Sequence, residues 1–248
     1  MTEKAIRLIA LDMDGTLLNH DHEVSEANKQ AIAKALEQDI HVVLSTGRGW
    51  DTCHPYAKIL KLTSYLVTVN GGQIWNMNGE LLKQQLLDPE KMEAMFQLAN
   101  DSELEFWMMS TTRVFRERPD DFRNYEWLKF GCNSLDKEKL DQLVEDLSYM
   151  EGLELTNSLP TNVEVNPEGV SKADSLQFVC REIGITMDEI MAVGDSLNDI
   201  KMIQEAGVGV AMGNAQEAIK NVANHVTETN ENDGVAKAIE RFALRTHA

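Results

Sequence analysis

The 248-residue chain is poor in cysteine, in basic side chains and in long apolar runs. Its three cysteines are widely spaced and form no CxxC pair, which excludes a zinc knuckle or a disulfide framework and indicates reduced thiols. No apolar run approaches the roughly 20 residues that span a bilayer. The N-terminal run, Ile6 to Leu11, is too short for a signal peptide. We therefore expect a soluble, cytoplasmic protein that is not bound to a membrane.

Positive charge is also scarce, because 23 lysines and arginines face 41 aspartates and glutamates, for a formal net charge of −18. A field of this sign repels polyanions and acidic membrane surfaces. It excludes nucleic acid as the main partner, since proteins that bind DNA or RNA need a basic surface to displace counterions from phosphates. The remaining composition, 43% hydrophobic and 26% charged, is that of an ordinary globular protein.

Apolar runs and helical periodicities alternate along the first part of the chain. Short apolar runs at residues 6–11, 40–45 and 65–69 are typical of strands buried on both faces of a parallel sheet. Segments with helical spacing, at residues 25–36 and 50–60, separate them. The alternation predicts an α/β fold with a Rossmann-like, doubly wound, mainly parallel sheet.

This alternation stops after residue 83 and resumes near residue 167. Between these points the pattern is α+β, with a pair of strands near residues 104–117 and a charged amphipathic helix at 136–150. The interruption predicts an inserted domain. We expect a catalytic core of residues 1–83 and 167–248, and an insert of residues 84–166.

Acidic and hydroxyl side chains follow the predicted strands, where open α/β sheets place their active sites. They are Asp12 and Asp14 after the first strand, Ser45 and Thr46 at the end of the second, and Asp195 and Asp199 after the strand at 190–194. Four gathered carboxylates would repel one another, by roughly 4 kcal/mol for a pair 4 Å apart at an effective dielectric constant of ~20. They therefore need a cation, and hard oxygen ligands favour Mg²⁺ over zinc. Magnesium among carboxylates is suited to a phosphate ester.

Four segments in this order resemble the motifs of the haloacid dehalogenase superfamily of phosphatases. They are Asp12-Met13-Asp14-Gly15-Thr16, Ser45-Thr46-Gly47-Arg48, Lys172, and Gly194-Asp195-Ser196-Leu197-Asn198-Asp199. The insert, with Asn70-Gly71-Gly72 ahead of it, is similar to the large C2-type cap of the Cof-type subfamily. The later stretches 206–215 and 233–236 also resemble that subfamily. The resemblance covers nearly all of the core but little of the insert.

The resemblance implies three catalytic residues. Asp12 would be the nucleophile that attacks phosphorus and forms an aspartyl-phosphate. Asp14 would protonate the leaving alkoxide and then take a proton from the hydrolytic water. Lys172 would supply positive charge to the nucleophile and to the transferring phosphoryl group.

The resemblance also implies a ligand set. Phosphate would be bound by Thr46, the Gly47 amide, Lys172 and Asn198. Mg²⁺ would be bound by side chains of Asp12 and Asp195 and by the backbone carbonyl of Asp14. Asp199 would lie beside the metal and orient either metal-bound water or Lys172. Arg48 is left open between a substrate contact and a packing role.

The function predicted from these residues is a Mg²⁺-dependent phosphatase of small phosphorylated metabolites. Family resemblance implies sugar phosphates, or phosphorylated cofactors such as pyridoxal phosphate or flavin mononucleotide, with the insert choosing among them. One alternative is a phosphomutase that uses the same aspartyl-phosphate. Another is a non-catalytic module that senses a phosphorylated metabolite. Both a monomer and a homodimer are compatible with the sequence.

Overall fold

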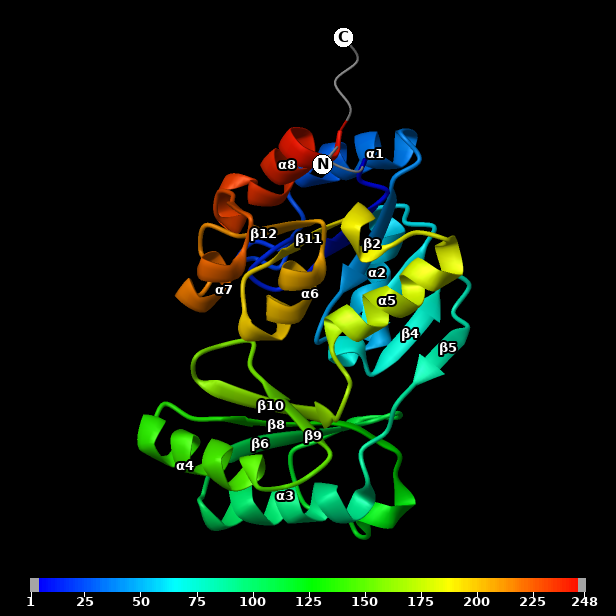
Figure 1. Ribbon diagram of the computed structural model, residues 1–248. Coiled ribbons are helices and arrows are strands. Elements are labelled where there is room, and N and C mark those ends of the chain that lie inside the picture. Colours follow the sequence, from blue (N-terminus) through cyan, green and yellow to red (C-terminus); the bar gives the residue numbers. More distant parts are fainter. Residues whose placement is uncertain (1–4, 245–248) are drawn as a thin grey trace. The chain divides into compact units, whose positions relative to one another are not determined.

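The computed structural model describes residues 5–244, which form two units. One unit comprises the described residues within 1–82 and 172–248, and the other comprises residues 83–171. Each has its own sheet (Figure 1). Each also has its own apolar core.

The first unit is built on an eight-stranded sheet. From one edge to the other its strands are β13 (His225–Val226), β12 (Val208–Ala211), β11 (Ile190–Gly194), β1 (Leu8–Leu11), β2 (His41–Ser45), β3 (Tyr65–Thr68), β4 (Gln73–Asn76) and β5 (Leu81–Gln84). Pairing is parallel from β13 to β3, and β4 pairs with β3 in the antiparallel sense. The predicted mainly parallel sheet is confirmed.

Helices flank this sheet. They are α1 (Glu26–Glu37), α2 (Trp50–Ile59), α5 (Lys172–Ile183), α6 (Ile200–Glu205), α7 (Glu217–Val222) and α8 (Gly234–Ala238). The Ser25 hydroxyl accepts a hydrogen bond from the Asn28 amide and so begins α1. Helices α1 and α8 pack together, as do α5 and α6. Strands β1 and β11 are buried along their whole length, as their continuous apolar runs predict.

The position of β1 inside the sheet determines where the site can form. Its neighbours are β11, from late in the chain, and β2, from early in the chain. The order of strands therefore changes direction at β1, and a crevice opens at the carboxyl ends of strands flanking such a point. The segments that leave these three strands begin at Asp12, Thr46 and Asp195.

The second unit is α+β, as predicted. Its antiparallel sheet has the order β7 (Val114–Phe115), β6 (Glu105–Ser110), β8 (Trp127–Asn133), β10 (Asn162–Pro167) and β9 (Leu153–Thr156). Helices α3 (Pro89–Asp101) and α4 (Lys137–Ser148) share its apolar core. Asp88 begins α3 with its carboxylate at the amides of Glu90 and Lys91, and Pro89 occupies the first turn.

Strand β8 is central to this sheet, yet the sequence pattern does not predict it. Six of its seven residues are buried, so the strand lacks the alternation of polar and apolar residues that marks a half-exposed strand. Gly131 also makes the strand harder to predict, since glycine is unfavourable inside strands. Its place is explained by the ring of Trp107, which lies 2.1 Å from where a Cβ at this position would be.

All three cysteines are free and buried, so the expectation of no disulfide is confirmed. Burial raises the pKa of Cys53 to about 12 and those of Cys132 and Cys180 to about 11. Across residues 5–244, none of the helices combines the length and the apolar character needed to cross a membrane.

A buried ion pair joins two strands of the second unit. The Lys129 ammonium on β8 donates to Glu164 Oε2 on β10 at 3.0 Å, and the Ser158 hydroxyl donates to Glu164 Oε1 at 3.0 Å. Only 3% of Lys129 and 5% of Glu164 is exposed. Removing one partner of such a pair leaves a buried charge without compensation, whereas replacing both by apolar residues is often neutral.

We predict that Lys129→Met lowers the free energy of unfolding by about 3–5 kcal/mol, because Glu164 stays buried and charged. The double variant Lys129→Met/Glu164→Leu should recover most of this loss. Urea denaturation followed by circular dichroism measures both. Equal losses in the single and double variants would contradict the prediction.

Candidate active site

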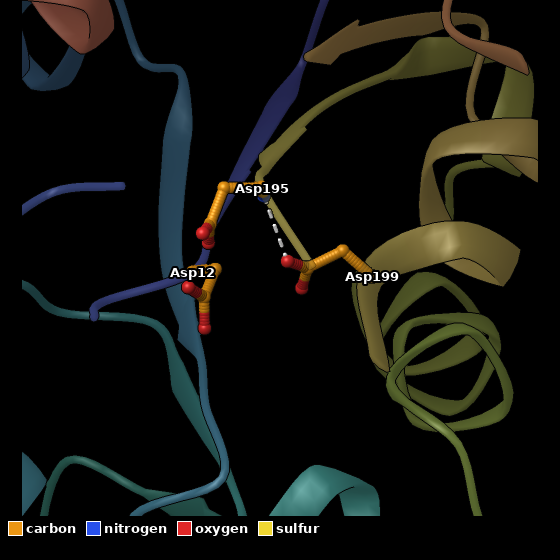
Figure 2. A group of neighbouring side chains, drawn as sticks. All are labelled: Asp12, Asp195 and Asp199. Carbon is orange, nitrogen blue, oxygen red and sulfur yellow. Dashed lines mark hydrogen bonds between the residues drawn. The ribbon is translucent and has the colours of Figure 1, made fainter. Parts of the chain in front are cut away.

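Three carboxylates gather at the carboxyl ends of β1 and β11. Asp12 follows β1, Asp195 follows β11, and Asp199 closes the short 3₁₀ turn Leu197–Asp199 (Figure 2). Each offers a carboxylate oxygen, and the three oxygens lie within 4.8 Å of one another. Asp12 is held in place by its amide, which donates to the Val193 carbonyl at 3.0 Å.

The electrostatics of this cluster favour a cation. Burial raises the pKa of Asp12 well above its ordinary value, although the Lys172 ammonium opposes this shift. Burial, helped by the nearby charge of Asp199, raises the pKa of Asp195 to about 7. Such shifts mean that negative charge is under-compensated here. A hard divalent cation fits this set of oxygen donors, and Mg²⁺ is the natural candidate.

Two hydroxyl groups orient the Asp195 carboxylate, and Gly15 leaves room for it because glycine has no side chain. The Thr16 hydroxyl donates to Asp195 Oδ1 at 3.2 Å, and the Ser196 hydroxyl donates to Oδ2 at 3.0 Å. Gly15 has a φ of +77°, and a Cβ there would lie 2.6 Å from Asp195 Oδ2. Glycine is therefore required at position 15 both by its backbone conformation and by the carboxylate beside it.

Lys172 joins Asp12 to Asp199. Its Nζ donates to Asp12 Oδ1 and to Asp199 Oδ1, each at 2.6 Å, and its side chain is completely buried. Burial alone would lower the pKa of Lys172, but the two carboxylates outweigh it and raise the pKa. Lys172 is therefore a permanent positive charge beside Asp12.

The second oxygen of Asp199 is engaged as well. Asp199 Oδ2 accepts from the backbone amides of Asp195 at 2.9 Å and Ser196 at 3.1 Å. Both oxygens of Asp199 thus have protein donors: Oδ2 accepts from the loop that carries Asp195, and Oδ1 accepts from Lys172. Of the two roles that the sequence leaves open for Asp199, this geometry favours the orientation of Lys172.

Besides Lys172, the residues expected to bind phosphate follow two strands: Thr46 and Gly47 follow β2, and Asn198 follows β11. Thr46 follows β2, is buried, and its Oγ1 accepts from the Arg48 amide at 3.2 Å, so the chain bends around Gly47. The Asn198 Nδ2 donates to Asn70 Oδ1 at 3.3 Å. Asn198 Oδ1 is buried without a hydrogen-bond partner within the described part of the chain, which is unusual for a buried acceptor.

The Asp14 side chain lies outside the carboxylate cluster, which corrects the expectation that four carboxylates gather. The chain turns directly after β1, where the Thr16 amide donates to the Met13 carbonyl at 3.3 Å, and the Asp14 side chain is 49% exposed. Arg48 binds it through two hydrogen bonds, from Nε to Oδ2 at 2.8 Å and from Nη2 to Oδ1 at 2.6 Å. Only the backbone carbonyl of Asp14 remains a candidate metal ligand.

Arg48 is thereby a site residue whose role the sequence leaves undecided. Its guanidinium also lies over the Tyr56 ring, 5.5 Å from the centroid, and Nη2 is 3.4 Å from His22 Nδ1. The signal that could have indicated this partner is the position of Arg48, which lies three residues after the end of β2, the parallel neighbour of β1, and so at the same end of the sheet as Asp14. Asn70 also contacts a site residue, because its Oδ1 accepts from Asn198 Nδ2.

The sequence matches the model of the haloacid dehalogenase-like hydrolase family over residues 9–134 and 120–239. The chain belongs to this family. It is 47% identical to the 5-amino-6-(5-phospho-D-ribitylamino)uracil phosphatase YcsE of Bacillus subtilis, over 96% of both chains. It is 31% identical to phosphatase YwpJ of the same organism, over 96% of this chain and all of that one.

A solved haloacid dehalogenase-like hydrolase from B. subtilis has the same fold. The two superpose with a TM-score of 0.89 at 27% identity, over 95% of this chain and 99% of that one. Because these relatives are phosphatases of the family, the chain is a phosphoric monoester hydrolase acting on phosphorylated metabolites. The family membership and the enzyme class expected from the four motifs are both confirmed.

We predict that Lys172→Met strongly destabilises the metal-free hydrolase, by about 3 kcal/mol or more, since it leaves Asp12 and Asp199 buried without their shared cation. Thermal and urea unfolding measure the loss. The matched control is Lys34→Met, which breaks an ion pair with Glu240 in which each side chain is 54% exposed. This substitution should cost less than about 1 kcal/mol. Similar losses in the two variants would contradict the central place given to Lys172.

Proposed function

We propose that this hydrolase is a Mg²⁺-dependent phosphatase of 5-amino-6-(5-phospho-D-ribitylamino)uracil that works through an aspartyl-phosphate. One observation carries the choice of substrate, namely 47% identity over 96% of both chains to a phosphatase with that substrate. The compound is a small phosphorylated metabolite, which is the class of substrate that the sequence leads us to expect. Its phosphate is a monoester of a primary alcohol, and hydrolysis yields the free ribityl compound and inorganic phosphate.

Mg²⁺ would be held by the Asp12 and Asp195 side chains and by the Asp14 backbone carbonyl. The crowding of buried carboxylates supports this assignment. When bound, the ion would neutralise charge on the phosphoryl oxygens and on the nucleophile.

Asp12 is the proposed nucleophile. One of its oxygens would attack phosphorus in line with the ester oxygen, so that an O–P bond to Asp12 forms as the bond to the alkoxide breaks. Lys172, 2.6 Å from Asp12 Oδ1, would keep Asp12 ionised and oriented and would stabilise the negative phosphoryl group. Thr46, the Gly47 amide and Asn198 would position the other phosphoryl oxygens. Water would then cleave the acyl phosphate.

Asp14 is the proposed acid and base. It would donate a proton to the leaving ribityl oxygen and later accept one from the hydrolytic water, so that protons balance over the cycle. Arg48 holds the Asp14 carboxylate through two hydrogen bonds in this structure. We infer that Asp14 exchanges this partner for the substrate oxygen during the reaction.

We assign the choice of leaving group to the second unit, residues 83–171. The phosphoryl chemistry proposed above uses residues of the first unit alone. Since every phosphatase of this kind performs the same phosphoryl chemistry, discrimination between substrates needs contacts from elsewhere.

The substrate assignment predicts that the protein releases phosphate from 5-amino-6-(5-phospho-D-ribitylamino)uracil with Mg²⁺ and loses this activity with a chelator. A panel of sugar phosphates, pyridoxal phosphate, flavin mononucleotide and phosphoglycolate should show a kcat/KM lower by about tenfold or more. Phosphate released should equal substrate consumed, because a phosphomutase would retain the phosphate in organic form. A better substrate in the panel would refute the assignment, and no Mg²⁺-dependent release from any compound would refute the phosphatase.

The assignment of the nucleophile predicts that Asp12→Asn lowers kcat by about a thousandfold or more, since an amide oxygen is a poor nucleophile. The matched control is Asp39→Asn, in an exposed turn with a φ of +58° that asparagine tolerates. It should retain wild-type kcat. Acid-quench trapping of radiolabelled phosphate on the wild-type chain, absent from Asp12→Asn, locates the covalent bond. Retained turnover in Asp12→Asn would show that another residue attacks.

A further inference from the structure

A turn directly after β3 has a costly backbone conformation. Val69, Asn70 and Gly71 all have positive φ, of +55°, +57° and +103°. This conformation is common for glycine and tolerated by asparagine, but a β-branched valine rarely adopts it. Outliers of this kind persist where surrounding contacts impose them, and they cluster at functional sites.

The contacts that impose the turn come from the phosphate-binding loop. The Val69 amide donates to the Arg48 carbonyl at 2.9 Å, and the Asn70 amide donates to the Thr46 carbonyl at 2.9 Å. These two carbonyls lie on either side of Gly47. The turn therefore clamps the backbone of the segment whose amide and hydroxyl are proposed to hold phosphoryl oxygens.

Two more segments of the site meet the same turn. The Ser175 hydroxyl donates to the Gly71 carbonyl at 3.0 Å, and Ser175 lies one turn after Lys172 in α5. The Asn70 side chain accepts from Asn198 Nδ2 at 3.3 Å. The turn at 69–71 thus connects the loop after β2, the helix of Lys172 and the loop after β11, and Asn70 itself is 2% exposed.

We propose that Asn70 is a positioning residue of the active site that acts through Asn198. By accepting from Nδ2 it fixes the orientation of the Asn198 amide: one Nδ2 hydrogen is held by Asn70, the other can donate to a phosphoryl oxygen, and Oδ1 is buried without a protein donor. Its own left-handed backbone is what brings its side chain to Asn198 while its amide holds Thr46. This inference rests on the proposed phosphatase function and adds a residue that makes no direct contact with substrate.

The two functions of Asn70 can be separated by substitution. Asn70→Gly keeps the left-handed backbone and the amide bond to Thr46 but removes the acceptor for Asn198. It should lower kcat/KM for p-nitrophenyl phosphate by about tenfold and raise the inhibition constant of inorganic phosphate by a similar factor. The Mg²⁺ concentration that gives half-maximal activity should stay within about twofold of the wild-type value. A merely structural role would not move phosphate inhibition in the folded variant.

Asn198→Ala and the double variant complete the test. If Asn70 acts through Asn198, the double variant should be no worse than Asn198→Ala, whereas independent effects would multiply. Asp39→Gly is the matched control, because it also places glycine at a left-handed position, with a φ of +58°, in an exposed turn away from the site. It should leave both constants unchanged.

Three results would overturn the proposal while leaving the phosphatase itself intact. One is an Asn70→Gly variant whose kcat/KM and phosphate inhibition constant are both within twofold of the wild type. Another is a double variant in which the effects of Asn70→Gly and Asn198→Ala multiply. The third concerns Asn70→Asp, which keeps an acceptor and tolerates the same backbone and which serves if Asn70→Gly does not fold. It should retain more activity than Asn198→Ala, and less would refute the inference. By contrast, an inactive wild type would refute the proposed function instead.

Discussion

The site depends on one buried ammonium group placed between two buried carboxylates. Lys172 donates to Asp12 and Asp199 at 2.6 Å each, and no part of its side chain reaches solvent. Three carboxylates could not stay together in this crevice without positive charge, since Asp12 and Asp199 are buried and Asp195 is partly buried. The ammonium compensates only part of the negative charge, which leaves the cluster ready to accept a divalent cation.

The sheet topology is what makes this arrangement possible. The parallel pairing of β1 with β11 and β2 aligns the ends of three strands, and Lys172, 160 residues after Asp12 in the chain, reaches Asp12 from the first turn of α5. Asp199 then fixes the loop after β11 by accepting from two of its amides and presents its other oxygen to Lys172. Backbone geometry and charge compensation therefore support each other: the loop positions the carboxylate, and the carboxylate holds both loop and lysine.

The sequence predicts the parts of this site whose chemistry is carried by residue type and strand position. Asp12 and Asp195 follow short apolar runs that are typical of buried parallel strands, so their meeting at one end of the sheet follows from topology. The Asp14 side chain shows the limit of that reasoning, because its direction depends on a turn after β1 and on a partner, Arg48, from another loop. The pattern does not predict strand β8 because Lys129 and Gly131 interrupt its apolar run, so it shows neither the alternation of a half-exposed strand nor the continuous apolar run of β1 and β11.

Asn70 illustrates a deeper limit. The Asn70-Gly71-Gly72 segment predicts a sharp turn, and a turn is present, but the pattern does not indicate that Val69 also adopts a left-handed backbone. That conformation comes from hydrogen bonds to Thr46 and Arg48, which exist only in the folded protein. Local propensity and tertiary contact disagree at this position, and the contact prevails.

The same balance explains how so acidic a protein can act on an anion. A net charge of −18 opposes the approach of any phosphate at long range, but salt screens that field over about 8 Å at physiological ionic strength. Within the crevice the nearest charges decide, and there Lys172 is fully buried and hence unscreened. A divalent cation on the carboxylate cluster would add two further positive charges at the same place. Part of the negative charge of the protein is therefore the means by which a phosphate ester can be bound.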